Sequence, residues 1–177
     1  MRSETASAFP ILSPSLAVAP LRNAAAVSAT LAGWALLTMD GVQLAVPQKD
    51  IVTIGLVMDL QFAQQDGGKE IGWFVQHAER WPVYCLDRHF VLAPMLAKVA
   101  RVCMLFRSAD HTFGLAGTQV LLLANDDDLV VQPLPACLAR LGSPLNGLAL
   151  HRNEIVMSAR GSALTDLLIY LESSHGN

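Results

Sequence analysis

The stretch Arg101–Leu123 reads RVCMLFRSADHTFGLAGTQVLLL. It holds an apolar run, a short polar segment at residues 108–111, and a second apolar run that is interrupted by Gly114 and Gly117. Two runs of strand-forming residues joined by four turn-forming residues predict a β-hairpin. The glycines indicate a bend, a bulge or a close approach of two backbones. No residue of the stretch stands out as a catalytic group.

Two more hairpins are expected on either side of this stretch. The first is indicated by Asp40-Gly41, a dipeptide typical of tight turns between strands, and the second by the polar segment His151-Arg152-Asn153. Further strand-forming runs occur between the first hairpin and the central one. The predicted strands outside the central stretch are Trp34–Met39, Val42–Val46, Ile51–Leu60, Ile71–Val75, Trp81–Leu86, Leu129–Gln132, Leu145–Leu150 and Glu154–Ser158.

Helical signals are few. The segment Leu164–Leu171 has apolar residues at helical spacing and predicts a short C-terminal helix. The segment Phe90–Ala100 has a helix-compatible composition, but Pro94 permits a helix only if it begins near that residue. Gln61–Glu70 is polar and is expected to be a loop. Nine or ten short strands with regularly spaced turns predict β-barrels or a sandwich.

The bulk composition limits the classes of protein that the sequence can encode. The chain has 177 residues, of which 53% are hydrophobic and 15% charged, with a net charge of −3. This length suits one domain or two small subdomains with a common core. No apolar run approaches the ~18 residues of a spanning helix, so we expect no membrane insertion. Because Lys and Arg form no cluster, we also expect no nucleic-acid partner.

Residues 1–30 are rich in Ala, Ser and Pro, and Pro10, Pro14 and Pro20 exclude a long helix before residue 20. We expect an extended or flexible segment, with a short helical turn around Asn23–Thr30. A secretory signal is the alternative interpretation, but prolines interrupt the apolar tract and Arg22 lies inside it. A cytoplasmic location is therefore expected.

Few residues suggest chemistry. The five histidines have no metal-binding spacing, so no metal and no cofactor are expected. Cys85 with Asp87 and His89 is the most suggestive local group, because a thiol near an imidazole can become a nucleophile. The simpler interpretation is a buried cysteine at a strand end followed by a solvated turn. All three cysteines, Cys85, Cys103 and Cys137, have apolar neighbours and are expected to be reduced core residues.

The order of these features resembles the chemotaxis coupling protein family, the CheW-like domain, from about Trp34 to Leu171. The resemblance is carried by five stretches and by their order. They are MDGVQLAVPQKDIVTI at 39–54, PVYCLDRHF at 82–90, the central stretch at 101–123, LNGLALHRNEIVM at 145–157 and ALTDLL at 163–168.

Two departures mark the chain as a divergent relative. The family's Asn-Leu-Arg-Gly turn is absent from Gly72–Arg80, which reads GWFVQHAER, and Gly117 or Thr118 stands where the family has an acidic residue. Both family features are associated with receptor and kinase contacts. The resemblance therefore favours a chemotaxis-like or type IV pilus-like system over standard chemoreceptor coupling.

The resemblance implies a mainly β fold of two SH3-like five-stranded β-barrel subdomains that share a hydrophobic core, with short helices including one at the C-terminus. It implies a flexible segment at 1–30, a CheW-like domain at 31–172 and a tail at 173–177. The implied role is a bacterial, non-catalytic adaptor that bridges a receptor or scaffold protein and the regulatory domain of a CheA-type histidine kinase. The candidate partner-binding residues are Ile71, Trp73, Val75, Leu115 and Val120.

Two alternatives to the adaptor stay open. One is a β-barrel module that binds a small molecule or a peptide, with an accidental likeness to the family. The other is an enzyme that uses Cys85 and His89.

Overall fold

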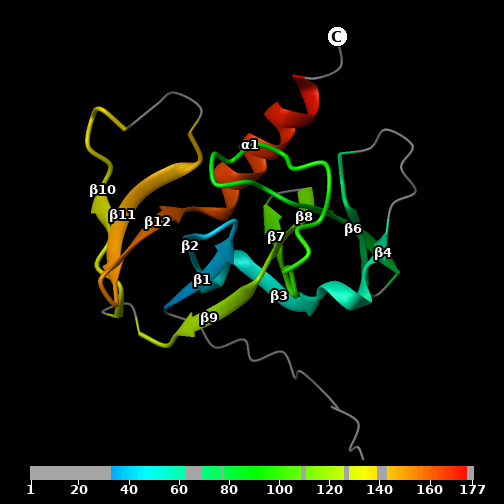
Figure 1. The fold of residues 1–177 in the computed structure, drawn as a ribbon, viewed down its shortest axis with the longest axis horizontal. Helices are drawn as coiled ribbons and strands as arrows, with labels where there is room; N and C mark the ends of the chain where they lie inside the picture. The colour runs from blue at the N-terminus through cyan, green and yellow to red at the C-terminus, as the bar shows by residue number, and fades with distance from the viewer. Residues whose placement is uncertain are drawn as a thin grey trace, which may run out of the picture.

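The computed structural model describes residues 33–62, 69–76, 78–108, 111–125, 128–138 and 143–174. Two β-sheets lie side by side, and a C-terminal helix lies above their junction (Figure 1). Residues 1–30 and the turn residues Ala109 and Asp110 lie outside the described residues. The structure therefore does not test the expectations for them.

Sheet A has the strand order β10-β11-β12-β2-β1-β9. It pairs the first two strands of the chain with the last ones, and the contact between β12 and β2 is parallel. The strands are β1 (Trp34–Met39), β2 (Val42–Pro47), β9 (Gln119–Leu123), β10 (Gln132–Pro133), β11 (Leu145–His151) and β12 (Glu154–Ala159).

Sheet B has the order β3-β7-β8-β6-β5-β4 and is built from one continuous part of the sequence. Within the described residues each sheet has six strands, where five were expected, because the two-residue strands β4 and β10 each extend one edge. The strands of sheet B are β3 (Ile51–Leu56), β4 (Gln61–Phe62), β5 (Gly72–Gln76), β6 (Glu79–Tyr84), β7 (Val102–Ser108) and β8 (His111–Gly117).

The alternation of side chains along two strands creates three cores. Leu37 on β1 faces a core between the sheets, whereas its neighbour Leu36 faces a core inside sheet A. In the same way, Met104 on β7 faces the core between the sheets and Leu105 faces a core inside sheet B. Successive side chains of a strand point to opposite faces, so each of these strands serves two cores. This arrangement joins two small subdomains through one apolar layer, which we call the inter-sheet core.

The central hairpin is confirmed, and its second apolar run divides between the two sheets. β7 and β8 pair antiparallel from Val102↔Gly117 to Ser108↔His111, and the chain then leaves sheet B for β9 of sheet A. Thr118 lies at this crossing, where its backbone N–H and its hydroxyl both donate to the carbonyl of Thr38. A Cβ on Gly117 would lie 2.5 Å from that carbonyl oxygen, so the close approach suggested by the glycine is real.

Helix α1 (Gly161–Ser173) follows β12 directly and begins three residues earlier than predicted. The Asp50 carboxylate, in the 3-10 turn η1 (Gln48–Asp50) before β3, accepts a hydrogen bond of 2.9 Å from the Gly161 amide. At the other end, Lys69 donates to the carbonyls of Leu171 and Glu172. The helix is thus tied at both ends to residues that lie close to sheet B in the sequence.

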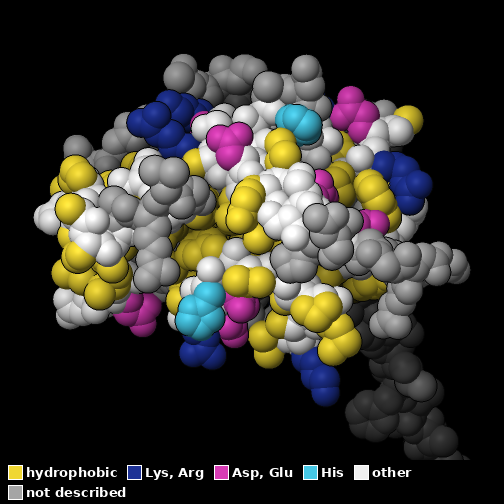
Figure 2. All heavy atoms as spheres, turned by 90° about the horizontal axis from the view of Figure 1, so that it is seen from above, with side chains coloured by type: hydrophobic (Ala, Val, Ile, Leu, Met, Phe, Trp, Pro, Cys, Tyr) yellow, Lys and Arg dark blue, Asp and Glu magenta, His cyan; other side chains and the backbone are white. Residues whose placement is uncertain are grey.

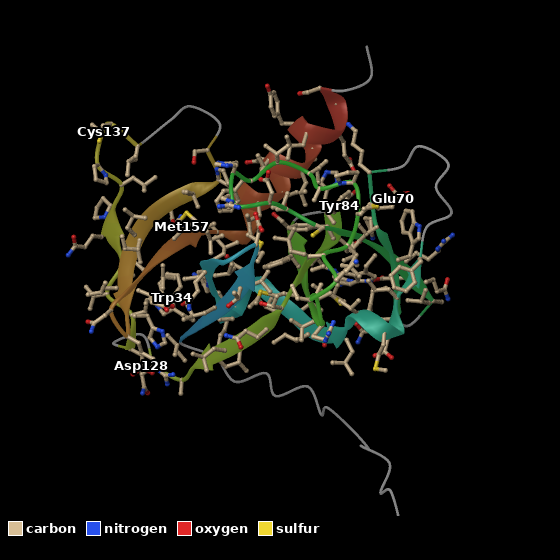
Figure 3. All side chains as sticks on the ribbon, in the orientation of Figure 1. Trp34, Glu70, Tyr84, Asp128, Cys137 and Met157 are labelled. Carbon is tan, nitrogen blue, oxygen red and sulfur yellow. The ribbon has the colours of Figure 1, made fainter. Side chains whose placement is uncertain are left out.

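Several local expectations require correction. The segment 90–100 contains no helix; instead it folds as turns, with a bridge between Leu86 and Leu92. The strand predicted to reach Leu60 ends at Leu56, and a second 3-10 turn, η2 (Val57–Asp59), follows it. The predicted loop 61–70 begins with β4. Cys137 is exposed at the outer edge of sheet A rather than buried in a core (Figure 3).

The outer hairpins are confirmed. Asp40 and Gly41 both have positive φ, as do Arg152 and Asn153 in the turn between β11 and β12. Two residues of left-handed backbone form the tight turn that matches the twist of paired strands.

Candidate interaction surface

An apolar strip runs along the seam between the two sheets. We define this seam strip by five side chains on three strands: Ile54, Leu56, Val102, Val120 and Leu122. The strand pairing places each of these side chains on the sheet face that is turned toward the inter-sheet core. Each nevertheless remains partly or largely exposed. Clustered exposed apolar side chains are typical of surfaces that bind another protein.

β3 supplies one side of the seam strip. Ile54 pairs with Met104 and Leu56 with Val102, so both side chains lie on the face of sheet B that is turned toward sheet A. They are 38% and 48% exposed. The register shifts between Ile51 and Thr53, and the intervening Val52 is also exposed. Such a bulge bends an edge strand and re-aims its side chains.

β9 supplies the other side. Val120 pairs with Leu37 and Leu122 with Ala35, two residues of the inter-sheet core. Leu122 is 55% exposed, and Val120 is partly buried against the same core. Within the described residues, β3 pairs only with β7 and β9 only with β1, so each strand leaves one edge without a strand partner. An unpaired edge beside apolar side chains can accept an added strand or a helix.

The five sequence-predicted contact residues do not form one surface. Ile71 and Leu115 are buried, in the core of sheet B and in the inter-sheet core respectively. Leu115 is fully buried, so its side chain is not available to a partner in this structure. Val120 belongs to the seam strip. Trp73 and Val75 lie elsewhere, on β5.

The face of β5 with Trp73 and Val75 forms a second exposed area. Phe74 packs against the core of sheet B, so its two neighbours on β5 point outward. Val75 is 42% exposed, and the Arg80 guanidinium lies 4.7 Å from the centre of the Trp73 ring. This stacking holds the indole in place and adds a positive charge beside it.

In the Cys85, Asp87 and His89 group the thiol is buried and the carboxylate binds the backbone of its own loop. Burial raises the pKa of the Cys85 thiol, which opposes thiolate formation. The Asp87 carboxylate accepts hydrogen bonds from the backbone amides of His89 and Val91, at 2.8 and 3.0 Å. It therefore shapes its own loop, as an Asx turn does, and the simpler interpretation of this group fits the geometry.

A cavity of about 170 Å³ lies beside Cys85, between the β1–β2 turn and the crossing at Thr118. Its walls include Met39, Met95 and Ala116, with Asp40 among the few polar residues. Sites for drug-sized ligands usually measure roughly 300–1,000 Å³. The cavity thus gives little support to the alternative of a small-molecule module.

Charged and metal-binding groups are scattered. On the face seen in Figure 2, Lys and Arg occur in separate places rather than in one stripe. Among the described residues no group of three or more His, Cys, Asp or Glu could hold a metal ion. His77 and His175 lie outside the described residues. No helix of the described part of the chain is long and apolar enough to cross a bilayer.

Sequence reasoning missed most of the seam strip, although a signal for it was present. In β3 (IVTIGL) five of six residues are apolar or glycine, a pattern usually found in strands buried on both faces. Here one face lies toward the core of sheet B and the other is partly exposed. What the sequence alone does not reveal is that β3 lies at a sheet edge.

No protein-family model and no curated protein matches the sequence. The structure, however, is similar to the crystal structure of the scaffolding protein TtCheW from Thermoanaerobacter tengcongensis. The TM-score is 0.55 at 13% sequence identity, over 72% of this chain and 88% of that chain. The chain therefore shares the two-subdomain β fold of this scaffolding protein.

Proposed function

We propose that the protein is a non-catalytic adaptor of a chemotaxis-like or type IV pilus-like signalling system. In this role it bridges a receptor or scaffold protein and the regulatory domain of a CheA-type histidine kinase. The observation that carries the proposal is the seam strip, an exposed apolar surface on two unpaired strand edges, in a fold similar to that of a scaffolding protein.

An adaptor needs at least two separate surfaces, one for each protein that it bridges. The seam strip, with Ile54, Leu56, Val120 and Leu122, offers one of them. The outer face of β5, with Trp73 and Val75, offers the other. Trp73 is well suited to such a contact because aromatic side chains and arginine dominate the energetics of protein interfaces.

The divergence at Gly117 or Thr118 bears on the type of partner, and the surroundings of Gly117 are the more restrictive. A Cβ at this position would lie 2.5 Å from both the Thr38 carbonyl oxygen and the Leu37 Cδ1, so an acidic side chain does not fit here. A partner that requires this acidic group is not expected to bind. This supports a divergent system over a standard chemoreceptor.

The test is binding of the full chain to receptor cytoplasmic tips and kinase regulatory domains from the same cell, by calorimetry. Ile54→Asp places a charge in the seam strip and is expected to weaken one of the two interactions by at least about tenfold, since buried unpaired charges are costly. Ile155→Asp on β12, also at an exposed position, is the matched control and should leave both interactions unchanged. If the full chain binds none of these domains, the proposal is overturned.

A further inference from the structure

The residues before β1 leave the described structure at one end of the seam strip. The Gln48 amide donates to the Gly33 carbonyl at 3.0 Å, and the Gln48 side chain donates to the carbonyls of Trp34 and Leu123. The Gln48 side chain therefore joins the start of β1 to the end of β9. The segment that precedes Gly33 meets the fold beside Leu122.

The chemistry of this segment matches the surface beside it. Between Thr5 and Ala32 the only charged residue is Arg22. The stretch Leu16–Leu21, LAVAPL, is apolar throughout. Pro20 lacks a backbone donor, which is tolerated in a strand at a sheet edge but not in a central one. Two apolar surfaces, one on the segment and one on the fold, gain free energy when they cover each other.

The segment is also long enough. Twelve residues separate Leu21 from Trp34, and an extended chain covers ~3.3 Å per residue, or roughly 40 Å. β9 has five residues and spans about 17 Å. Residues 16–21 can therefore reach any point of the seam strip without strain in the connecting residues.

We propose that residues 16–21 of the same chain occupy the seam strip and compete there with the external partner. The unpaired edges of β3 and β9 supply backbone partners, and Ile54, Val120 and Leu122 supply the apolar contact. This regulatory role rests on the proposed function, whereas the occupancy itself does not.

Paramagnetic relaxation enhancement tests the occupancy without any partner. In a Cys137→Ser background the remaining cysteines are buried, so a nitroxide attached to Val18→Cys labels one position. The proposal predicts strong broadening of amide signals on β3 and β9, including Ile54 and Leu122. It also predicts little broadening near Leu150 and Ile155, which serve as an internal control on sheet A. Ile54→Asp should abolish the broadening, and Ile155→Asp should leave it unchanged.

Broadening that is absent, uniform over the surface, or unaffected by Ile54→Asp would overturn the proposal. A mixture of isotope-labelled protein without nitroxide and unlabelled spin-labelled protein distinguishes a second copy. If the mixture shows the same broadening, the occupant belongs to another molecule and the intramolecular proposal fails.

The regulatory role has its own readout. If residues 16–21 cover the strip in nine molecules of ten, Leu16→Asp combined with Val18→Asp raises the apparent affinity for the strip's partner about tenfold. An unchanged affinity, with the relaxation result confirmed, would reject competition and keep the occupancy. Failure of all partner binding in the calorimetric test would reject the adaptor function but would not alter the relaxation result.

Discussion

At Gly117 the backbone of β8, in sheet B, touches β1 of sheet A. A Cβ there would lie 2.5 Å from both the Leu37 side chain and the Thr38 carbonyl oxygen, which is closer than real Cβ contacts permit. Gly117 has no positive φ, so its requirement is steric and not conformational. The glycine therefore permits the two sheets to meet at the crossing of the chain.

We expect Gly117→Ala to lower the free energy of unfolding by about 1–3 kcal/mol, the usual cost of overpacking. Gly117→Asp should cost more, because it adds a charge to the same closed space. Urea denaturation measures both effects. Gln119→Asp, two residues along and exposed, adds the same charge outside the contact and should be nearly neutral. Equal stability of the Gly117 and Gln119 variants would contradict the steric argument.

The buried cysteines predict how stability depends on pH. Burial raises the pKa of Cys103 from its ordinary value of 9.0 to about 11. Between these values the unfolded chain loses the thiol proton while the folded chain keeps it. The contribution of this thiol is therefore complete below about pH 9 and is lost as the pH rises toward 11. The free energy of unfolding, measured by urea denaturation, should fall across this range.

Cys103→Ala removes this source of pH dependence. The variant is expected to be less stable at pH 8 because it loses a buried side chain, but its stability should decline less steeply above pH 9. A slope identical to that of the parent protein would show that the Cys103 thiol ionises as readily in the folded chain as in the unfolded one.

At the scale of elements, helix α1 illustrates how a weak sequence signal is completed by tertiary contacts. The helix begins at Gly161, after Arg160, and none of its own side chains caps its first turn. The cap comes instead from Asp50, 111 residues away in the sequence. At the far end, the Tyr84 hydroxyl forms a hydrogen bond with the Glu172 carboxylate, and Figure 3 shows Tyr84 close to the helix.

Removal of the remote cap should destabilise the helix. Asp50→Ala is expected to lower the free energy of unfolding by roughly 1 kcal/mol, the typical value for a lost N-terminal cap. Hydrogen exchange should become faster at the amides of the first turn of α1. Asp59→Ala removes an exposed carboxylate from the other 3-10 turn and serves as the control. Equal exchange in both variants would contradict a capping role for Asp50.

Strands beside tight turns were predicted well because they depend on local sequence, whereas the strand expected at Leu129–Gln132 is present only as β10, Gln132–Pro133. The turns at Asp40-Gly41 and Arg152-Asn153 need left-handed backbone, which short polar residues and glycine favour, and their strands lie where expected. The segment 90–100 was ambiguous because its composition suits a helix, whereas the structure shows turns and a bridge to Leu86. The number of strands per sheet was missed because two-residue strands carry no periodicity.

The contact residues were predicted less well, for a physical reason. Whether an apolar side chain of a strand lies in a core or on a surface depends on which strands are at the edges, and this is a property of the whole sheet. Leu115 and Ile54 have similar sequence surroundings, but Leu115 lies on an inner strand and Ile54 on an edge strand. Only Val120 of the predicted set lies on the seam strip.

At the scale of the whole molecule, the inter-sheet core should make the two subdomains unfold as one. It joins side chains of β1 and β2 to side chains of β7, β8 and α1. These elements come together where the two sheets meet in Figure 1. Trp34 reports on sheet A, whereas Trp73 and Trp81 report on sheet B. Fluorescence of variants that retain either Trp34 or Trp81 should therefore give the same urea midpoint.

Leu37→Ala tests this coupling. Truncation of a fully buried leucine is expected to lower the free energy of unfolding by about 2–5 kcal/mol and to shift both tryptophan signals together. Leu122→Ala, at an exposed position, should have a much smaller effect. Separate midpoints for the two tryptophans would show that each sheet is stable alone.

The crossing at Thr118 has a consequence for biosynthesis. The strands of sheet B in the described part of the chain lie between residues 51 and 117, whereas sheet A needs strands from both sides of that interval. During translation, sheet B can therefore form as soon as residue 117 leaves the ribosome, while β1 and β2 wait for β12. During this delay Leu37 and Leu44 of the β1–β2 hairpin lack the side chains of β12 and α1 that share their core in the folded chain.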